Sequence, residues 1–321
     1  MAFLDKAAIF FYIFFYHLYS EMFVFFDDKI IAADQVKLDL TNRSFRYGDG
    51  LFETIRMFNY KLPYLDKHLN RLEAGCAVLD MVLEDDFRKN IQGLLIKLAE
   101  KNQTPNARLR LMVFRKGGGL YTPETNKASV FIECKKLETA SFLWNEKGLK
   151  LGIYREMKIQ PSIISPYKTN NCLPYILAAI YKKKNNLDEC VLLNENNNIA
   201  DSISSNVFIV KGDQIITPKI SDGGVAGTMR SILIEVLKSQ NQLVQEKSIT
   251  ENDLLDADEI FLTNAIRGIQ AVGLFQGKEY ACAKIFNRFN TYEVGISKNK
   301  KRLPIFMICK HQKRKSPKQQ Y

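Results

Sequence analysis

Apolar residues in the first half of the chain recur at two spacings, one typical of helices and one of strands. A helix with one buried face is predicted by residues at alternating intervals of four and three, Leu65, Leu69, Leu72, Cys76 and Leu79. A second helix is predicted at residues 87–97. Strands are predicted at residues 51–57, 108–115 and 129–134, and a strand–turn–strand pair begins at Phe23.

The second half alternates in the same way. Strands are predicted at residues 149–154, 190–194 and 207–210, and helices at residues 175–183 and 228–238. Strands and helices mixed in this order are typical of an α/β fold of the mixed, α+β kind. We expect one large or two medium domains from a chain of 321 residues.

The hydrophobic pattern weakens after Lys135, and we place a domain boundary in this region. A smaller α/β domain is then expected at residues 22–139 and a larger domain at residues 140–294. Residues 1–21 are expected to form an apolar extension, and residues 295–321 a tail.

The extension contains an almost unbroken apolar run of thirteen residues, 7–19, interrupted only by His17. A helix that crosses a bilayer needs about 20 such residues, so no stable membrane span is predicted. A signal peptide is not favoured, because its basic region is weak and no small-x-small cleavage site follows. We interpret the run as an extension outside the folded domains, and a membrane anchor stays open as the alternative.

The formal charge of +11 is concentrated in the tail. Residues 298–321 hold nine Lys or Arg and no acidic residue, and removing these nine leaves the rest of the chain at +2. A run this biased buries little surface, so we expect a solvated, disordered tail rather than a nucleic-acid-binding arm.

The cysteines and histidines predict neither a disulfide framework nor a metal site. The six cysteines are scattered without a C-x-x-C pair, which is typical of a reducing compartment, and we expect a cytoplasmic protein. The three histidines, His17, His68 and His311, have no metal-ligand spacing and no evident place in a Ser-His-Asp triad.

Three residues stand out by their setting, although each also has an ordinary interpretation. Lys168 lies in a loop before a helix, where a lysine is usually a solvated charge. Gly227 precedes a helix, where a glycine is usually a flexible joint. Arg71 lies on the helix face opposite to the leucines, where an arginine is usually exposed to solvent. Each of these residues alone leaves the function open.

Four blocks in a fixed order are more specific: RSFRYGDGLFETIR at 43–56, HLNRL at 68–72, KTNN at 168–171, and ADSISSNVFIV to GGVAGTMR at 200–230. With these blocks, residues 23–294 resemble the class IV aminotransferases. This family of pyridoxal-phosphate enzymes includes branched-chain and D-amino-acid aminotransferases and aminodeoxychorismate lyase. The resemblance implies a two-domain fold of type IV, an active site in the interdomain cleft, pyridoxal 5'-phosphate as the cofactor, and a homodimer.

The resemblance also implies roles for individual residues. Lys168 stands where the family binds the cofactor as a Schiff base and then uses the lysine as a base. Asp201, five residues before Asn206, stands where the family places a glutamate against the pyridine nitrogen, and it is one methylene shorter. Arg71 stands where an arginine holds the phosphate.

Two further segments match the phosphate side of the family's site. Gly227, Thr228 and Met229 match the start of a helix where free N–H groups and the helix dipole favour an anion. Asn264 and Ala265 match a second turn, which we expect to contribute mainly backbone N–H groups.

Four positions bear on the reaction within the family. Leu173 stands where branched-chain enzymes carry a tyrosine that reaches the ring hydroxyl, so that specificity is not favoured. Met229 and Ala265 stand at two positions where aminotransferases tend to carry threonine. In carrying other residues there, this chain resembles the lyase branch. Thr54 matches a lyase position at which a hydroxyl could relay a proton, and a purely structural role in its strand is the alternative.

Substrate carboxylates are expected near the segment RKGGGLY, with Arg115, Lys116 and Tyr121 as candidates. We therefore expect a lyase that converts 4-amino-4-deoxychorismate to 4-aminobenzoate and pyruvate on the way to folate. An amino-acid aminotransferase of the same fold is the alternative, and a basic nucleic-acid-binding protein is a remote one.

Overall fold

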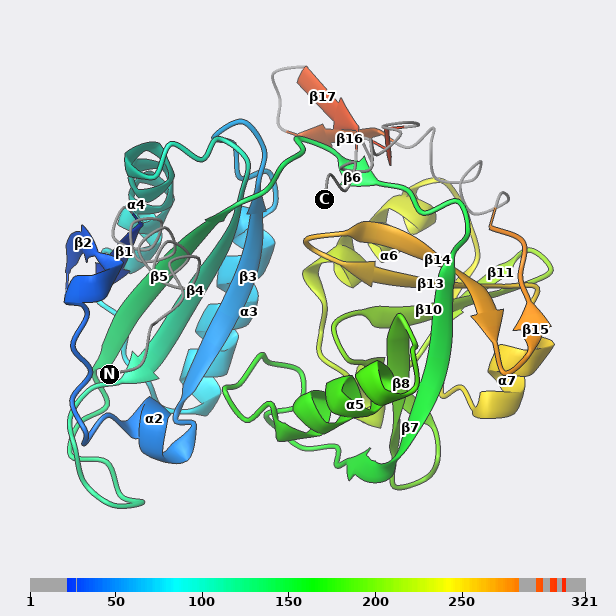
Figure 1. Cartoon of the computed structure of the whole chain (residues 1–321), viewed down its shortest axis with the longest axis horizontal. Helices are drawn as coiled ribbons and strands as arrows, with labels where there is room; N and C mark the ends of the chain where they lie inside the picture. Colours follow the sequence, from blue (N-terminus) through cyan, green and yellow to red (C-terminus); the bar gives the residue numbers. More distant parts are fainter. Residues whose placement is uncertain (1–21, 27, 283–292, 297–300, 305–307, 310–321) are drawn as a thin grey trace, which may run out of the picture.

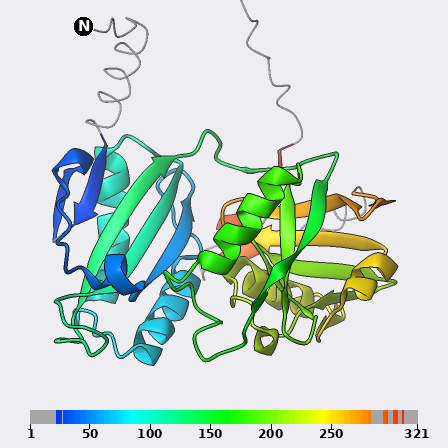
Figure 2. The same ribbon diagram turned by 60° about the horizontal axis from the view of Figure 1, so that its bottom comes forward.

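The structure is a computed structural model that describes residues 22–26, 28–282, 293–296, 301–304 and 308–309. Two separate sheets account for most of it, and in both views they lie side by side (Figure 1, Figure 2).

The first sheet has five antiparallel strands in the order β2-β1-β5-β4-β3. The strands are β1 (Phe23–Phe26), β2 (Lys29–Ala32), β3 (Gly50–Met57), β4 (Ala107–Arg115) and β5 (Ala128–Lys136). Two helices, α3 (Leu65–Val78) and α4 (Phe87–Lys101), bury their leucines against it in one core. A 3-10 turn (Ala33–Gln35) and the short helix α2 (Arg43–Tyr47) lead into β3.

Strand β4 shows why this sheet has two different faces. Leu109 and Leu111 are fully buried in the core with the helices, whereas Arg108 and Arg110, which alternate with them, point to the other face. Alternation of this kind follows from the pleat of a strand. The face opposite to the helices therefore carries polar side chains.

The second sheet has nine strands, in the order β12-β11-β10-β13-β14-β7-β8-β9, with β15 paired to β14. The strands are β7 (Leu149–Ile159), β8 (Glu189–Asn194), β9 (Ile199–Ser202), β10 (Asn206–Lys211), β11 (Gln214–Thr217), β12 (Val244–Glu246), β13 (Glu259–Asn264), β14 (Gly268–Phe275) and β15 (Lys278–Glu279). Its helices are α5 (Leu173–Lys184), a 3-10 turn (Ile220–Asp222), α6 (Thr228–Ser239) and α7 (Glu251–Asp256).

The predicted helices and strands are confirmed, with differences at their ends. α4 continues to Lys101, and β7 continues to Ile159, beyond the predicted residues. Helix α2 was not expected. The side chain of Asn42 accepts the N–H of Phe45 at its start, and Gly48 ends it with a φ of 68°.

The chain crosses between the sheets after Lys136 and enters the second sheet at Leu149, through the short strand β6 (Phe142–Leu143). We propose residues 22–139 and 140–294 as the two domains on this basis. The predicted extension at residues 1–21 lies outside the described residues.

The predicted tail is described only in part. β17 (Lys301–Pro304) pairs with β16 (Glu293–Ile296), and β18 (Ile308–Cys309) pairs with β6. Elsewhere in the tail the expected disorder stays a prediction. Among the helices of the described residues, none has the length and apolar composition to cross a membrane.

Candidate active site

A cavity of about 930 Å³ is lined by residues from both sheets. It collects most of the predicted site residues: Lys168, Thr54, Asp201, Arg71, Gly227, Thr228, Met229, Asn264 and Ala265. Arg115, Lys116 and Tyr121 are not among its lining residues. The cavity lies against the polar face of the five-stranded sheet, because Thr54 and Arg110 line it from β3 and β4.

Lys168 presents its amine to this cavity from the loop before α5. The amine lies 4.7 Å from the centroid of the Phe52 ring. Burial lowers the pKa of Lys168 below its ordinary value, Arg71 lowers it further, and the carboxylates of Glu53 and Asp201 oppose this shift. A lysine of lowered pKa has a larger fraction of free amine, which is the nucleophilic and basic form.

Asp201 is a buried carboxylate at the end of β9, with 4% of its surface exposed. One oxygen accepts the N–H of Val225 at 3.1 Å. The other accepts the N–H of Ser202 at 3.0 Å and Nδ2 of Asn206 at 3.2 Å. Burial raises the pKa of Asp201 to about 7, although the Val225 and Ser202 amides act in the opposite direction. The side chain is therefore fixed in place and ready to share a proton.

Arg71 forms a buried ion pair that the sequence did not indicate. Its Nε and Nη2 donate to the two oxygens of Glu53 at 2.7 and 2.6 Å, and Nη1 donates to the carbonyl of Ala226 at 2.8 Å. Nδ1 of His68 lies 2.6 Å from the same carboxylate. Burial alone would raise the pKa of Glu53, but the charges of Arg71 and His68 hold it at about 2. Arg71 thus lies at the cavity wall in a fixed orientation.

The first turn of α6 forms another part of the wall. Gly227 precedes it and no side chain caps its N–H groups, while the Thr228 hydroxyl lies 3.5 Å from Nε2 of His68. A Cβ atom at Gly227 would lie 1.8 Å from Oδ1 of Asn206, so only glycine fits here. Uncapped N–H groups at a helix start are a site for an anion.

The turn after β13 offers fewer N–H groups than expected. Oδ1 of Asn264 accepts the N–H groups of Ile266 and Arg267 at 3.0 and 2.7 Å. Nδ2 of Asn264 donates to the hydroxyl of Ser205 at 2.9 Å. The amide of Ala265 is therefore the group in this turn that we assign to an anion.

Two arginines that the sequence had not singled out line the cavity, Arg108 and Arg110. Arg110 lies directly opposite Thr54 across β3 and β4, with its guanidinium 4.2 Å from the centroid of the Phe52 ring. Within the described residues neither guanidinium forms an ion pair with a carboxylate. The alternation of apolar and polar residues along β4 is the sequence signal that could have placed both arginines on one face of the strand.

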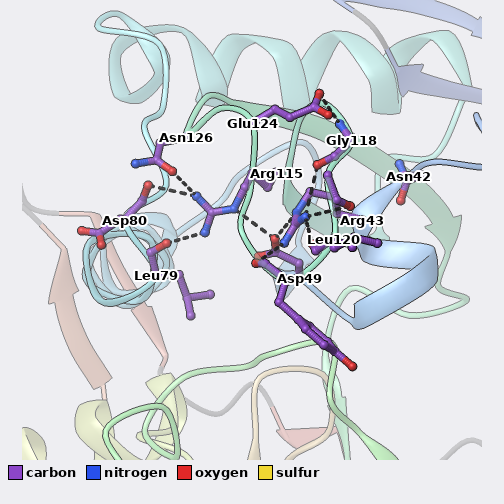
Figure 3. Close-up of polar contacts among 12 residues, drawn as sticks. Asn42, Arg43, Asp49, Leu79, Asp80, Arg115, Gly118, Leu120, Glu124 and Asn126 are labelled. Carbon is purple, nitrogen blue, oxygen red and sulfur yellow. Dashed lines mark hydrogen bonds and ion pairs between the residues drawn. The ribbon is translucent and has the colours of Figure 1, made fainter.

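The predicted substrate candidates have other surroundings (Figure 3). Nε of Arg115 and Nε of Arg43 both donate to Oδ2 of Asp49, at 3.0 and 2.7 Å. Arg115 also donates to Oδ1 of Asn126 at 2.7 Å and is 6% exposed. In this chain Arg115 therefore holds loops together, and its role in substrate binding stays a prediction.

Arg43 holds the loop that follows Arg115. Its guanidinium donates to the carbonyls of Leu120 and Tyr121 at 2.5 and 3.2 Å (Figure 3). The side chain of Tyr121 is 89% exposed. Tyr121 therefore lies on the surface, Lys116 is half-buried, and neither lines the cavity of the same chain.

Two residues of α5 lie at or near the position where branched-chain enzymes carry a tyrosine. Leu173, at that position, is 67% exposed and does not line the cavity. Tyr175 does line it, and burial raises its pKa well above the ordinary range, so the phenol stays a hydrogen-bond donor. Its place two residues further along α5 was not anticipated.

A family model, described as amino-transferase class IV, matches residues 50–275. The chain belongs to the class IV aminotransferase family. It is therefore an enzyme, and its family works with pyridoxal 5'-phosphate. An aminodeoxychorismate lyase of Vibrio harveyi is 31% identical over 241 residues, which are 74% of this chain and 87% of the relative. A putative branched-chain-amino-acid aminotransferase of Methanocaldococcus jannaschii is 26% identical, over 80% and 89% of the two chains.

Solved structures show the fold. A branched-chain aminotransferase from Thermoproteus uzoniensis superposes with a TM-score of 0.76 at 21% identity, over 83% of this chain and 91% of that one. A 4-amino-4-deoxychorismate lyase from Pseudomonas aeruginosa superposes with a TM-score of 0.71 at 22% identity, over 83% and 96%. The expected type IV fold is confirmed.

The cavity has the groups that pyridoxal 5'-phosphate needs. An amine of lowered pKa suits its aldehyde, a buried carboxylate held by N–H groups suits its ring nitrogen, and an uncapped helix start suits its phosphate. In the described part of the chain no group of three or more His, Cys, Asp or Glu residues could hold a metal ion.

Proposed function

We propose that the protein is a pyridoxal-phosphate-dependent lyase that converts 4-amino-4-deoxychorismate to 4-aminobenzoate and pyruvate, a step of folate biosynthesis. One observation carries the proposal. Thr54 and Arg110 face each other across β3 and β4, and both line the cavity that contains Lys168. A hydroxyl and a guanidinium therefore border the space in which a substrate amine would meet the cofactor.

The arginines favour a substrate with two anionic groups. Aminodeoxychorismate carries one carboxylate on its ring and one on its enolpyruvyl group. Arg108 and Arg110 are two guanidiniums without a carboxylate partner in the described residues, and a guanidinium pairs with a carboxylate in a planar, two-bond geometry. An apolar amino acid has one carboxylate and would leave one of them unpaired.

The residues that line the same cavity can be assigned to the parts of the cofactor. We assign covalent binding to Lys168, the ring nitrogen to Asp201, and the phosphate to the first turn of α6 and the amide of Ala265. Arg71 lies beside this phosphate position, held there by its bonds to Glu53 and to the carbonyl of Ala226. When bound, the cofactor supplies a protonated ring that takes up the electron pair left on the substrate carbon after it loses its proton.

The side chains of this chain account for the proton transfers. The free amine of Lys168 takes the proton from the substrate carbon that bears the amine, while Asp201 keeps the proton on the ring nitrogen. The bond between the ring carbon and the enolpyruvyl oxygen then breaks, the hydroxyl of Thr54 hands a proton to this leaving group, which becomes pyruvate, and Lys168 returns the proton it took to Thr54. All substrate atoms are found in the two products, so the reaction consumes neither water nor an amino acceptor.

An aminotransferase is the second candidate, and a specific observation favours it. Tyr175 gives the cavity a phenol that could reach the ring hydroxyl, in place of the exposed Leu173. Against it, Met229 is buried and Ala265 has no hydroxyl, at two positions where the sequence favours the lyase branch.

The proposal includes a homodimer in the cytoplasm. One face of α5 supports the dimer, because it exposes four apolar side chains at intervals of three, one and three residues: Leu173, Ile176, Leu177 and Ile180. A monomer rarely leaves such a stripe in water. The free cysteines among the described residues are compatible with a reducing compartment.

The test is to supply purified protein with aminodeoxychorismate and no oxo-acid. The lyase produces 4-aminobenzoate and pyruvate in equal amounts, measured by chromatography and by a coupled reduction of pyruvate. A parallel reaction contains an amino acid and an oxo-acid in place of this substrate. Turnover in the parallel reaction alone would assign the aminotransferase.

A further inference from the structure

Arg56 is a buried arginine near the end of β3 that lies outside the cavity. It is 8% exposed, and within the described residues it forms no ion pair. Its guanidinium instead donates to three main-chain carbonyls. Nη1 donates to Ile266, and Nη2 donates to Thr139 at 3.0 Å and to Ser141 at 2.7 Å.

Two aromatic rings fix the plane of this guanidinium. Its central carbon lies 4.9 Å from the ring centroid of Phe58 and 4.8 Å from that of Phe142. The two rings meet edge to face at 5.4 Å. Burial lowers the pKa of Arg56 to about 10, so the side chain is still a cation at neutral pH. A buried cation without a carboxylate partner is costly, and the three carbonyl bonds offset only part of that cost, because Nε of Arg56 has no hydrogen-bond partner among the described residues.

The three carbonyls belong to segments that the chain brings together from far apart. Thr139 and Ser141 lie in the crossover between the two sheets, and Ile266 lies in the turn after β13. Arg56 therefore joins the five-stranded sheet, the crossover and this turn at one point.

The turn is held from both sides. Within it, Oδ1 of Asn264 accepts the N–H groups of Ile266 and Arg267. From outside, Arg56 holds the carbonyl of Ile266. Ala265 and Ile266 both line the cavity, so the orientation of the Ala265 amide depends on these two contacts.

We propose that Arg56 is a positioning residue that sets the anion affinity of the site by holding the turn 264–267, with the cofactor phosphate as the anion. This inference rests on the proposed cofactor site. An arginine suits the role because its planar fork reaches several carbonyls at once and packs against aromatic rings. A lysine offers one compact ammonium and cannot make the same set of bonds.

The test compares pyridoxal 5'-phosphate with pyridoxal, which lacks the phosphate. The dissociation constants of both compounds are measured from the absorbance of the imine at Lys168. The dissociation constant of pyridoxal divided by that of pyridoxal 5'-phosphate gives the contribution of the phosphate to binding. We expect Arg56→Lys to reduce this ratio about tenfold or more, because an oriented hydrogen bond to a charged group is lost. Arg56→Met should reduce it further. Arg88→Met is the matched control, since Arg88 is a surface residue of α4.

An unchanged ratio in Arg56→Lys would overturn the inference, whether both affinities fall equally or neither falls. A higher KM for the substrate with an unchanged ratio would also overturn it, because the turn would then bind the substrate carboxylate. If the Arg56→Met variant does not fold, the Arg56→Lys variant still tests the inference, because only folded protein forms the imine that the titration measures. Wild-type protein that forms no imine with either compound would contradict the proposed cofactor site instead.

Discussion

The main-chain N–H of Phe52 donates to the carbonyl of Lys168 at 2.8 Å. The N–H of Asn170 donates to the carbonyl of Gly50 at 2.9 Å, and Leu51 and Thr169 form an antiparallel bridge between these bonds. The segment that carries Lys168 is therefore paired with β3, an edge strand of the other sheet. Backbone hydrogen bonds, rather than a free loop, fix the lysine beside Phe52.

Gly50 tests this pairing. A Cβ atom there would lie 2.7 Å from Nδ2 of Asn170 and 2.8 Å from the carbonyl of Val113. We expect Gly50→Ala to lower the free energy of unfolding by ~1–3 kcal/mol and to weaken imine formation at Lys168. Gly93→Ala is the control, because its Cβ meets open space in α4, and it should raise the stability by ~0.5–1 kcal/mol. Denaturant titrations measure both, and equal stabilities would contradict the account.

Asp201 predicts a pH dependence of stability in the cofactor-free protein. Its folded pKa is about 7 and its ordinary value is 3.8, so the folded state holds the proton more tightly. The free energy of unfolding should therefore fall as the pH rises from about 4 to about 7, by roughly 4 kcal/mol at most. Asp201→Asn should remove this part of the slope. If the free energy of unfolding changes with pH in the same way in the parent and in Asp201→Asn, burial does not perturb the Asp201 carboxylate and the prediction is contradicted.

Arg110 and Arg115 should differ in what they affect. Arg110→Gln should raise the KM for aminodeoxychorismate about 10- to 100-fold and leave the stability near that of the parent, because the lost contacts are to substrate. Arg115→Gln should lower the stability by roughly 2–4 kcal/mol, since it leaves Asp49 with one fewer partner. Initial rates and melting curves measure the two effects, and the reverse pattern would restore Arg115 as the substrate residue.

Thr54 tests the proton transfer. Thr54→Val keeps the shape of the side chain and removes the hydroxyl, so kcat should fall about 100-fold with unchanged cofactor content. Thr54→Ser should recover a large part of the rate. A Val variant as fast as the parent would assign Thr54 a structural role in β3.

The sequence predicted helices α3 to α6 and strands β1 to β5, β7, β8 and β10, because each follows from local spacing, whereas the short helices α2 and α7 were not predicted. The sequence also contains the two faces of β4, since Leu109 and Leu111 alternate with Arg108 and Arg110. Which face looks onto the cavity depends on how two distant sheets pack, and spacing along one strand does not contain that information.

The missed site residues have the same cause. Glu53 and His68 lie in two blocks that were noticed separately, but their contact joins a strand to a helix. Arg115 was expected at the substrate because it begins the segment RKGGGLY, yet the alternation of β4 stops at Phe114, and Arg115 turns inward to Asp49. Such nonlocal contacts became apparent only in three dimensions.

The identity of the lysine that holds the cofactor tests the central claim most directly. Purified protein saturated with pyridoxal 5'-phosphate is reduced with borohydride, digested and mapped by mass spectrometry. We expect the pyridoxyl group on Lys168, which lines the cavity with a lowered pKa beside Asp201. Lys168→Ala should lose both the label and the activity. A pyridoxyl group on another lysine, or saturated protein without any label, would contradict the account.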